Sequence, residues 1–291
     1  MARGLDYALP ILFIAAALGL TGWLLSFGLG PDLVSALVVV PLAVAAVMLE
    51  RWRPERRDFV PFDQPFRTDV AHFFLNYELG YVLAAAACGA LGKVLVESGW
   101  PVLWPSHLPW FAQVVLAMYL GECVSYWQHR LAHRWPRYWR FHALHHSGGH
   151  LNLVRVVRFH FVDVGPAAFA SIAPLVVLGA SDALITWYLC LTATFGVLGH
   201  ANMRMRTPAW LAWIVCTPAV HRHHHARAAH DSDGNFGTVV MLFDLMFGTF
   251  RAPRPDGPGE VGIEDDPVPR GFWAQMSTPF RASRVQPTRT G

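Results

Sequence analysis

Long apolar runs dominate the first half of the chain. Residues 8–29 carry no charge, and residues 33–49 form a second run after a turn that contains Gly30 and Pro31. At about 1.5 Å per residue the first run can cross a bilayer core, and the second forms a shorter span. A cleaved signal peptide is the alternative for the first run, but its length and the span that follows favour a retained membrane helix.

Two further apolar runs cover residues 70–98 and 108–128, separated by a segment rich in Trp and Pro. The Trp residues of this connection fit an interfacial aromatic belt. Four arginines follow the second run, in RWRPERRD, so the positive-inside rule predicts that this loop and the amino terminus are cytoplasmic. The fourth span then returns to the cytoplasmic side and places His129 at that interface.

The apolar stretch 164–200 is too long for one span. As a single helix it would measure about 55 Å, whereas the bilayer core is about 30 Å thick. The GASD sequence at 179–182 predicts a turn, so we expect a helical hairpin, partly inserted, whose halves are each about 22 to 27 Å long. Residues after Asn202 predict a cytosolic cap with an interfacial helix in TVVMLFDLMFGTF, followed from residue 252 by an irregular tail.

Composition supports this all-α, polytopic integral membrane fold of about four transmembrane helices, the hairpin and a histidine-rich cap. Hydrophobic residues make up 54% of the chain and charged residues 15%, against roughly 25% charged in soluble domains. All the basic residues but Lys93 are arginines, which suit lipid phosphates and the cytoplasmic membrane face. Nucleic acid is a poor partner for an apolar chain without a basic stripe. The four cysteines form no CxxC pair, which indicates reduced packing residues.

The candidate chemistry lies in the histidines. In HRLAHRWPRYWRFHALHH, His129 and His133 are spaced i and i+4, which places both rings on one helical face. The HxxHH pattern occurs twice, so three rings could converge from one helical turn in each copy. Histidines at this spacing predict a metal site. The HxxxH pair and the two HxxHH blocks supply eight histidines, and His200 is a ninth expected ligand, which is more than one ion can bind. We therefore predict two metals in an all-histidine shell. The predicted ligands are His129, His133, His142, His145, His146, His200, His221, His224 and His225.

Other polar residues near these blocks are candidates for additional ligands or for hydrogen-bond acceptors of the ligand rings, which usually donate their second ring N–H. They are His160, Glu122, Asn152, Asp163, His223 and Asn235. For Glu122 we prefer an acceptor role over a structural ion pair. An anionic lipid headgroup could be held by Arg130, Arg134, Arg155 and Arg158. Neutral imidazole suits Zn, Cu, Fe and Ni, so spacing does not choose the metal. No HExxH protease motif or Glu-x-x-His carboxylate site is present.

The ordered set of motifs from about Asp69 to Arg251 resembles the fatty acid hydroxylase and sterol desaturase superfamily. These motifs are YWQHRLAH, WRFHALHHS, RFH, GHAN, TPAVHRHHH, NFG and FDLMFGTF. The resemblance implies two irons bound by the same nine histidines at the cytosolic membrane face. Fatty acid 2-hydroxylases of this group carry another histidine four residues before the equivalent of His200. Gly196 occupies that place here, so one coordination position is open, filled by water or taken by another residue. Sterol oxidases, alkylglycerol monooxygenase-like and ornithine-lipid hydroxylase-like enzymes remain alternatives within the superfamily.

The resemblance predicts a di-iron oxidoreductase that uses O2 and external electrons to hydroxylate an unactivated C–H bond of a lipid, either an acyl lipid, an ether lipid, an ornithine lipid or a sterol-like molecule. A desaturase with the same cluster is the alternative. Non-enzymatic metal transport or sensing is less favoured, because a transporter places ionisable ligands at the membrane midplane and these histidines gather at one face. The expected electron donor is a ferredoxin or cytochrome b5 type with a reductase, and zinc could replace iron in purified protein.

These inferences divide the chain into three parts and place it in a bacterial inner membrane with a cytoplasmic active site. Residues 1–68 form a transmembrane hairpin and basic loop, residues 69–251 the catalytic domain, and residues 252–291 the tail.

Overall fold

The computed structural model describes residues 2–59, 66–254, 257 and 259–281, and this part of the chain is helical, with three isolated β-bridges. Its long helices are α1(Ala2–Leu25), α2(Pro31–Trp52), α4(Leu79–Glu97), α5(Trp110–Arg134), α7(Phe161–Leu178) and α8(Asp182–His200). The shorter ones are α3(Phe66–His72), α6(Pro136–His146), α9(Pro218–His224), α10(Ala229–Ser232), α11(Leu242–Met246) and α12(Phe272–Ser277). A π-helical turn, η2(Phe73–Glu78), joins α3 to α4, and 3₁₀ turns lie at η1(Arg57–Phe59), η3(Leu153–Arg155), η4(Ala209–Trp213) and η5(Thr278–Phe280). The predicted all-α class is confirmed.

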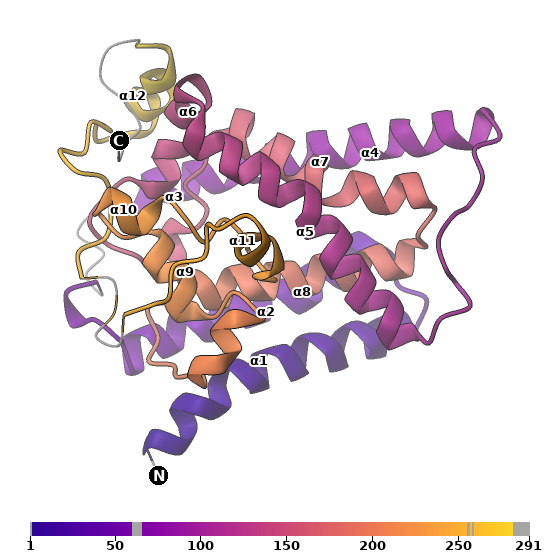
Figure 1. Cartoon of the computed structure of the whole chain (residues 1–291), viewed down its shortest axis with the longest axis horizontal. Coiled ribbons are helices and arrows are strands. Elements are labelled where there is room, and N and C mark those ends of the chain that lie inside the picture. Colours follow the sequence, from indigo (N-terminus) through magenta and orange to yellow (C-terminus); the bar gives the residue numbers. More distant parts are fainter. Residues whose placement is uncertain (1, 60–65, 255–256, 258, 282–291) are drawn as a thin grey trace.

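Two packed layers of long helices form the body of the molecule. Helices α1 and α2 pack on α8, while α7 packs on both α4 and α5 (Figure 1). Glycines permit the close approaches, because a Cβ on Gly80 would lie 2.3 Å from Val164 and one on Gly121 would lie 2.3 Å from the Tyr188 hydroxyl. Small residues play this role widely in membrane helix packing, where backbones must come close.

In the part of the chain that the structure describes, five helices are long and apolar enough to cross a membrane by length and composition: Gly4–Leu25, Pro31–Trp52, Arg67–Glu97, Phe161–Leu178 and Asp182–His200. Their outward faces are apolar, as Ile11 at 68% and Val96 at 81% exposure illustrate. The chain is an integral membrane protein. Both halves of the predicted hairpin therefore have the composition of full spans.

The predicted fourth span forms as a helix but is less apolar than the other long helices. Residues 108–128 fall largely within helix α5, as expected, but α5 is not among the apolar candidates in the described part of the chain. One side of α5 buries polar residues, including Gln113, Glu122 and His129, against the other helices. These buried groups lower the overall apolarity of the helix, while its other side exposes apolar residues such as Phe111 at 76% and Val124 at 42%.

The hairpin turn forms where the sequence places it. Gly179 ends α7 with φ of 78°, a left-handed conformation that glycine adopts without a Cβ penalty. Ser181 then begins α8 by accepting a hydrogen bond from the Leu184 amide through its hydroxyl. Because the turn reverses the chain, α8 brings its last residue, His200, back to the end of the bundle where α7 began.

The short helices α3, α6, α9, α10 and α12 gather at that end, together with the first residues of α1, whereas the α4–α5 connection lies at the opposite end (Figure 1). The tail is more ordered than predicted. Its residues Glu260 to Ile263 run beside the second histidine block, and the Gly262 amide donates to the His225 carbonyl at 3.0 Å. Farther on, Gln275 of α12 contacts the buried His72 ring at 2.7 Å. These long-range contacts explain why a segment without local periodicity contains a helix.

Candidate metal centre

Four helices bring the nine predicted histidines together. Helix α5 carries His129 and His133 near its end, α6 carries His142, His145 and His146, and α9 with its C-cap carries His221, His224 and His225. His200 is the last residue of α8. Pro136 begins α6 as its first helical residue, which starts a new helix directly after α5. Thr217 caps α9 by accepting from the Val220 amide.

The nine rings form two adjacent groups, each of which could hold a metal ion. The five-histidine group contains His129, His133, His142, His146 and His224, and all five are buried. The four-histidine group contains His145, His200, His221 and His225. Within each group the candidate ligand atoms lie within 4.8 Å of one another. The rings of His146 and His225 stack across the boundary with centroids 4.3 Å apart.

Each HxxHH block divides between the two groups, which differs from the expected convergence of three rings. His142 and His146 enter one group while His145 enters the other, and the second block divides in the opposite sense. Residues at i and i+4 share a helical face, whereas neighbours at i+3 and i+4 point about 100° apart. One helix can therefore supply ligands to two ions.

Hydrogen bonds donated by Nδ1–H determine which ring nitrogen is left unprotonated and able to bind a metal. The Nδ1–H groups of His129, His200 and His224 donate to the backbone carbonyls of Phe236, Gly196 and Gly234 at 2.8 to 2.9 Å. The Nδ1–H of His142 donates to the Asp163 carboxylate at 2.8 Å. Because carbonyl and carboxylate oxygens only accept, each of these neutral rings must carry its proton on Nδ1. The Nε2 atom of each ring is then a bare lone pair.

These lone pairs point at one another. His129 Nε2 lies 3.2 Å from His142 Nε2, and His200 Nε2 lies 3.0 Å from His221 Nε2. No proton is available between the first pair, and the buried Nε2 atoms of His133 and His224 have no hydrogen-bond partner among the described residues. Two nitrogens bound to one metal at about 2.0 to 2.1 Å are separated by roughly 3.0 to 3.4 Å. The donor set therefore fits metal cations.

Burial keeps the rings in the neutral form that binds metal. Desolvation, the largest cause, lowers the pKa of His224 to about 3 and those of His145, His146, His221 and His225 well below the usual value of 6.5. Neighbouring imidazoles lower these pKa values further, because charging one ring disfavours charging another. At neutral pH the cluster presents uncharged donors.

The loop Gly234–Phe236 supplies carbonyls to two of the rings, and two buried side chains fix its shape. Asn235 adopts φ of 55°, and its side chain exchanges hydrogen bonds with the Arg251 backbone. Asp244 accepts from the amides of Phe236 and Gly237 and from the Thr249 hydroxyl. Asn235 therefore acts through the loop it holds and contacts no histidine of either group in the described structure.

Glu122 has a different role from the acceptor role that we preferred. Its carboxylate accepts from the Thr238 and Val239 amides at 2.7 and 2.8 Å, and among the described residues it contacts no histidine ring. The carboxylate holds the segment after the NFG turn against α5. Of the suggested acceptors, Asp163 alone bonds a ring of the two groups among the residues described.

The remaining three polar candidates lie outside both groups. Asn152 caps η3 and donates to the Phe59 carbonyl. His160 caps α7 by accepting from the Val162 amide, and its ring packs on Phe141. His223 faces Asp231 at 3.4 Å, because it lies at the other helical phase from His221 and His224.

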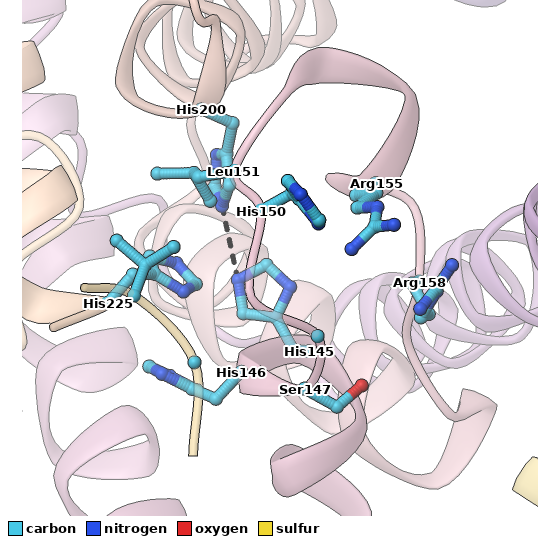
Figure 2. Close-up of a pocket in the computed structure, with 12 residues that line it drawn as sticks. His145, His146, Ser147, His150, Leu151, Arg155, Arg158, His200 and His225 are labelled. Carbon is cyan, nitrogen blue, oxygen red and sulfur yellow. Dashed lines mark hydrogen bonds between the residues drawn. The ribbon is translucent and has the colours of Figure 1, made fainter. Parts of the chain in front are cut away.

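The four arginines suggested for a headgroup separate into two pairs. Arg130 lies over the Trp127 ring, and Arg134 pairs with Asp233 at 2.8 Å, both away from the histidine groups. Arg155 and Arg158 line a small cavity that also contacts His145, His200 and His225. Figure 2 shows His145 and His200 pointing at each other, with both arginines beyond the His145 ring. Arg158 is also paired with the buried Asp69.

Aromatic residues that we did not predict enclose the rings. Phe159 stacks on His145 with centroids 3.9 Å apart, Phe236 lies 5.1 Å from His133, and Trp139 lies 5.1 Å from His133. The spacing of Trp139, His142 and His146 at i, i+3 and i+7 is a signal that could have identified the tryptophan. Phe159 and Phe236 depend on loop geometry, for which the sequence offers only their place in the RFH and NFG motifs.

Comparisons with known proteins agree with this geometry. A sequence model of the fatty acid hydroxylase family matches residues 114–249, a range that contains all nine histidines. An ornithine lipid hydroxylase of Rhizobium tropici is 36% identical over 270 residues, which cover 90% of this chain and 80% of that protein. The chain belongs to the fatty acid hydroxylase family. The resemblance recognised in the motifs is thereby confirmed.

More distant family members include alkylglycerol monooxygenases of Caenorhabditis elegans and Xenopus tropicalis, which are 29% and 30% identical. Those alignments cover 58% and 50% of this chain but only 33% and 31% of the relatives. The chain therefore spans about a third of the length of these monooxygenases. No solved structure matches the chain.

Proposed function

We propose that this protein is a membrane-bound non-haem di-iron enzyme that uses O2 and external electrons to hydroxylate an unactivated C–H bond of a lipid. The observation that carries the proposal is the pair of buried histidine groups with unprotonated Nε2 atoms, located at the end of a bundle of apolar helices. The relatives named above are lipid hydroxylases and monooxygenases, and their names support the same reaction class.

The five-histidine group would hold one iron and the four-histidine group the other. Bound iron supplies the O2 activation and one-electron chemistry that no protein side chain can provide. The chain fixes the donors: Asp163 and the carbonyls of Gly196, Gly234 and Phe236 orient four of the rings. Such orienting partners keep ligand rings in one tautomer and raise their basicity. Purified protein could carry zinc in these groups, since imidazole binds both metals.

Exclusion of water is the second contribution of the chain. All the rings except His145, which is partly exposed, are buried, and Phe159, Phe236 and Trp139 cover them. A site closed to bulk water protects a reactive oxidant from side reactions. The opening at the partly exposed His145 is the side from which we expect the substrate to approach.

The substrate is a polar membrane lipid in this proposal, with an ornithine lipid or an ether lipid as the first candidates because of the named relatives. Acyl lipids and sterol-like molecules are further members of the class. A desaturase outcome with the same cluster is not favoured by the relatives. A metal transporter is disfavoured by the position of the histidines, which gather at one end of the bundle and not along a path through it.

We place the site and the amino terminus on the cytoplasmic side of a bacterial inner membrane. Arg51 lies in the last turn of α2, and Arg53 and Arg56 follow it. The Arg56 amide donates to the side chain of Asn202, two residues after His200, so these arginines lie at the same end of the molecule as the histidines, which agrees with the positive-inside rule. Electrons would come from a separate ferredoxin or a cytochrome b5-type protein with its reductase.

The proposal is tested with purified, iron-loaded protein, a reductase system, and lipid supplied under isotopically heavy O2. We expect mass spectrometry to show a lipid product with one labelled oxygen atom. In a His145→Ala variant we expect loss of metal from the four-histidine group and loss of product. His107→Ala is the matched control, because His107 is exposed on the α4–α5 connection. A product that has lost two hydrogens without label would favour the desaturase, and full metal retention by His145→Ala would contradict the ligand assignment.

A further inference from the structure

A second cavity, of about 380 Å³, lies beside the histidine groups and is lined by more arginines than carboxylates. Its charged lining residues are Glu55, Arg56, Arg206, Arg222 and Arg254. This cavity has no part in the metal centre described above. Four guanidinium groups and one carboxylate line its wall.

One of these arginines lacks a carboxylate partner. The others pair at 2.6 to 2.9 Å: Arg56 with Asp58, Arg206 with Glu55, and Arg254 with Asp231. Arg222 instead donates to the carbonyls of Ala201 and Met203 at 2.8 and 3.0 Å, and no described carboxylate lies within 4.0 Å of it. A guanidinium held by carbonyls alone keeps its full charge, and it offers further N–H donors to an anion.

The cavity lies at the end of the molecule where the first span begins and the second span ends. Glu55 and Arg56 come within four residues of the end of α2, and the Arg206 amide donates to the carbonyl of Asp6 near the beginning of α1. Ala209 and Ala212 of η4 line the cavity, while Trp210 and Trp213 of the same turn are 63% and 54% exposed. Exposed tryptophans mark the interfacial zone of a membrane, where lipid headgroups lie.

A single layer of side chains separates this cavity from the histidines. Leu151 and Val261 line both the arginine cavity and the small cavity that contacts His145, His200 and His225. Figure 2 shows Leu151 beside His200 and His225. Both residues are buried and pack with Phe59. A lipid bound in the larger cavity would therefore have its headgroup within a few carbon atoms of the metal ligands.

We propose that the arginine cavity is a binding subsite for the anionic headgroup of a membrane lipid, whose phosphate or carboxylate oxygens bind at Arg222. The planar guanidinium matches such oxyanions with two parallel hydrogen bonds. The subsite rests on the proposed lipid hydroxylase function and gives it a substrate class, a lipid with an acidic group in its headgroup. In this proposal the headgroup is bound by arginines that line a cavity, in place of Arg130 and Arg134, which the sequence had suggested.

The test measures lipid binding by the metal-loaded, full-length protein in detergent, with phosphatidylglycerol as the anionic probe and a diacylglycerol of the same chains as the neutral probe. Arg206→Gln removes one positive charge and leaves the Glu55 carboxylate without its ion pair. Arg222→Lys keeps the positive charge but removes the planar guanidinium that can form two parallel hydrogen bonds. We expect each change to weaken phosphatidylglycerol binding about tenfold and to leave diacylglycerol binding unchanged.

Arg227→Gln is the matched control. Its side chain is 43% exposed, as is that of Arg206, and it likewise pairs with one glutamate, but it does not line the cavity. Parental phosphatidylglycerol binding in Arg206→Gln would overturn the proposal, and so would equal affinity for diacylglycerol. If Arg222→Lys does not fold, Arg206→Gln decides. Inorganic phosphate is tested in parallel, and arginine-dependent binding of phosphate without arginine-dependent binding of lipid would overturn the lipid assignment.

Binding is measured without turnover, so the two proposals fail separately. Absence of labelled product would contradict the hydroxylase reaction, whereas loss of anionic selectivity would contradict the subsite.

Discussion

The Nδ1 partner of each ring determines where its Nε2 lone pair points. Asp163 is the one charged partner among those described, and its carboxylate is buried beside His142. Backbone carbonyls serve His129, His200 and His224. A carboxylate raises the basicity of a ring more than a carbonyl does. His142 should therefore be the strongest donor of the five-histidine group.

Replacement of Asp163 should weaken metal binding without unfolding the bundle. We expect Asp163→Ala to lower metal affinity about 10- to 100-fold, because the His142 ring loses its fixed tautomer. Asp163→Asn retains an acceptor oxygen and should recover part of the affinity. Metal content measured during titration with a chelator checks this, with the exposed Asp32→Ala as control. Equal affinity in Asp163→Ala and the parent would contradict the role.

Gly196 leaves a place for a tenth histidine. Every i and i+4 histidine pair in the site enters the same group, and Gly196 is four residues before His200. A Cβ at Gly196 would meet no atom within 4 Å. We expect Gly196→His to be tolerated and to slow metal loss from the four-histidine group several-fold, as measured by release to a chelator. Gly196→Ala is the control, and faster metal loss in Gly196→His than in Gly196→Ala would contradict the prediction.

Among the helices, α6 and α9 each carry one HxxHH block and contribute to both histidine groups. Each gives two rings to one group and one ring to the other, so neither group can form from a single helix. The loop Gly234–Phe236 joins α9 to α5, because its carbonyls accept from His224 and His129, and Asp244 fixes that loop. Metal binding therefore depends on a short connection that contains none of the ligands.

Loss of Asp244 should affect both stability and metal binding. Its buried carboxylate accepts three hydrogen bonds, and removal leaves the amides of Phe236 and Gly237 unsatisfied. We expect Asp244→Ala to destabilise the protein by about 2 to 4 kcal/mol and to weaken metal binding. Thermal unfolding and metal content measure the two effects, with Asp182→Ala as an exposed control. If Asp244→Ala is destabilised but keeps its full metal content, the proposed dependence of metal binding on this loop is contradicted.

The sequence predicted the long helices, including α5, but not the partners of the polar side chains that α5 buries. Residues 108–128 were expected to span the membrane because of their length and apolar character. The polar residues Glu122 and Gln113 reveal a helix that faces protein on one side, yet their partners lie elsewhere in the chain or in loops. Local periodicity cannot distinguish lipid from protein as the neighbour of an apolar face.

At the scale of the whole molecule, segments far apart in sequence close the site. Glu50 at the end of α2 accepts from the amides of Leu153 and Asn202, which ties the amino-terminal helices to both sides of the histidine cluster. The tail covers the second block through Gly262. The three predicted parts of the chain are therefore in direct contact around the metal centre.

The neutral cluster should make the metal-free protein sensitive to acid. Burial lowers the pKa of His224 to about 3 and those of His145, His146, His221 and His225 well below 6.5, so between these values the unfolded chain binds protons that the folded chain does not. Stability then falls as pH decreases below about 6.5, by up to about 1.4 kcal/mol per pH unit for each histidine. Unfolding measured in detergent at pH 8, 6 and 5 checks this, and constant stability would contradict it.

The apolar runs, the hairpin turn, the helical pairs of histidines and the family could all be read from the sequence alone. Apolar length, capping residues and i, i+4 spacing are local properties, and a single helix expresses them wherever it lies. The packing of the helices decided the rest: the five-and-four division of the histidines, the oxygens that orient His129 and His142, the partners of the buried polar residues of α5, and the arginine cavity. Several of these features depend on contacts between residues far apart in the chain: His142 and Asp163 are 21 positions apart, and His129 and Phe236 are 107 apart. Such contacts depend on how the helices pack against one another, and a local sequence pattern does not determine this packing.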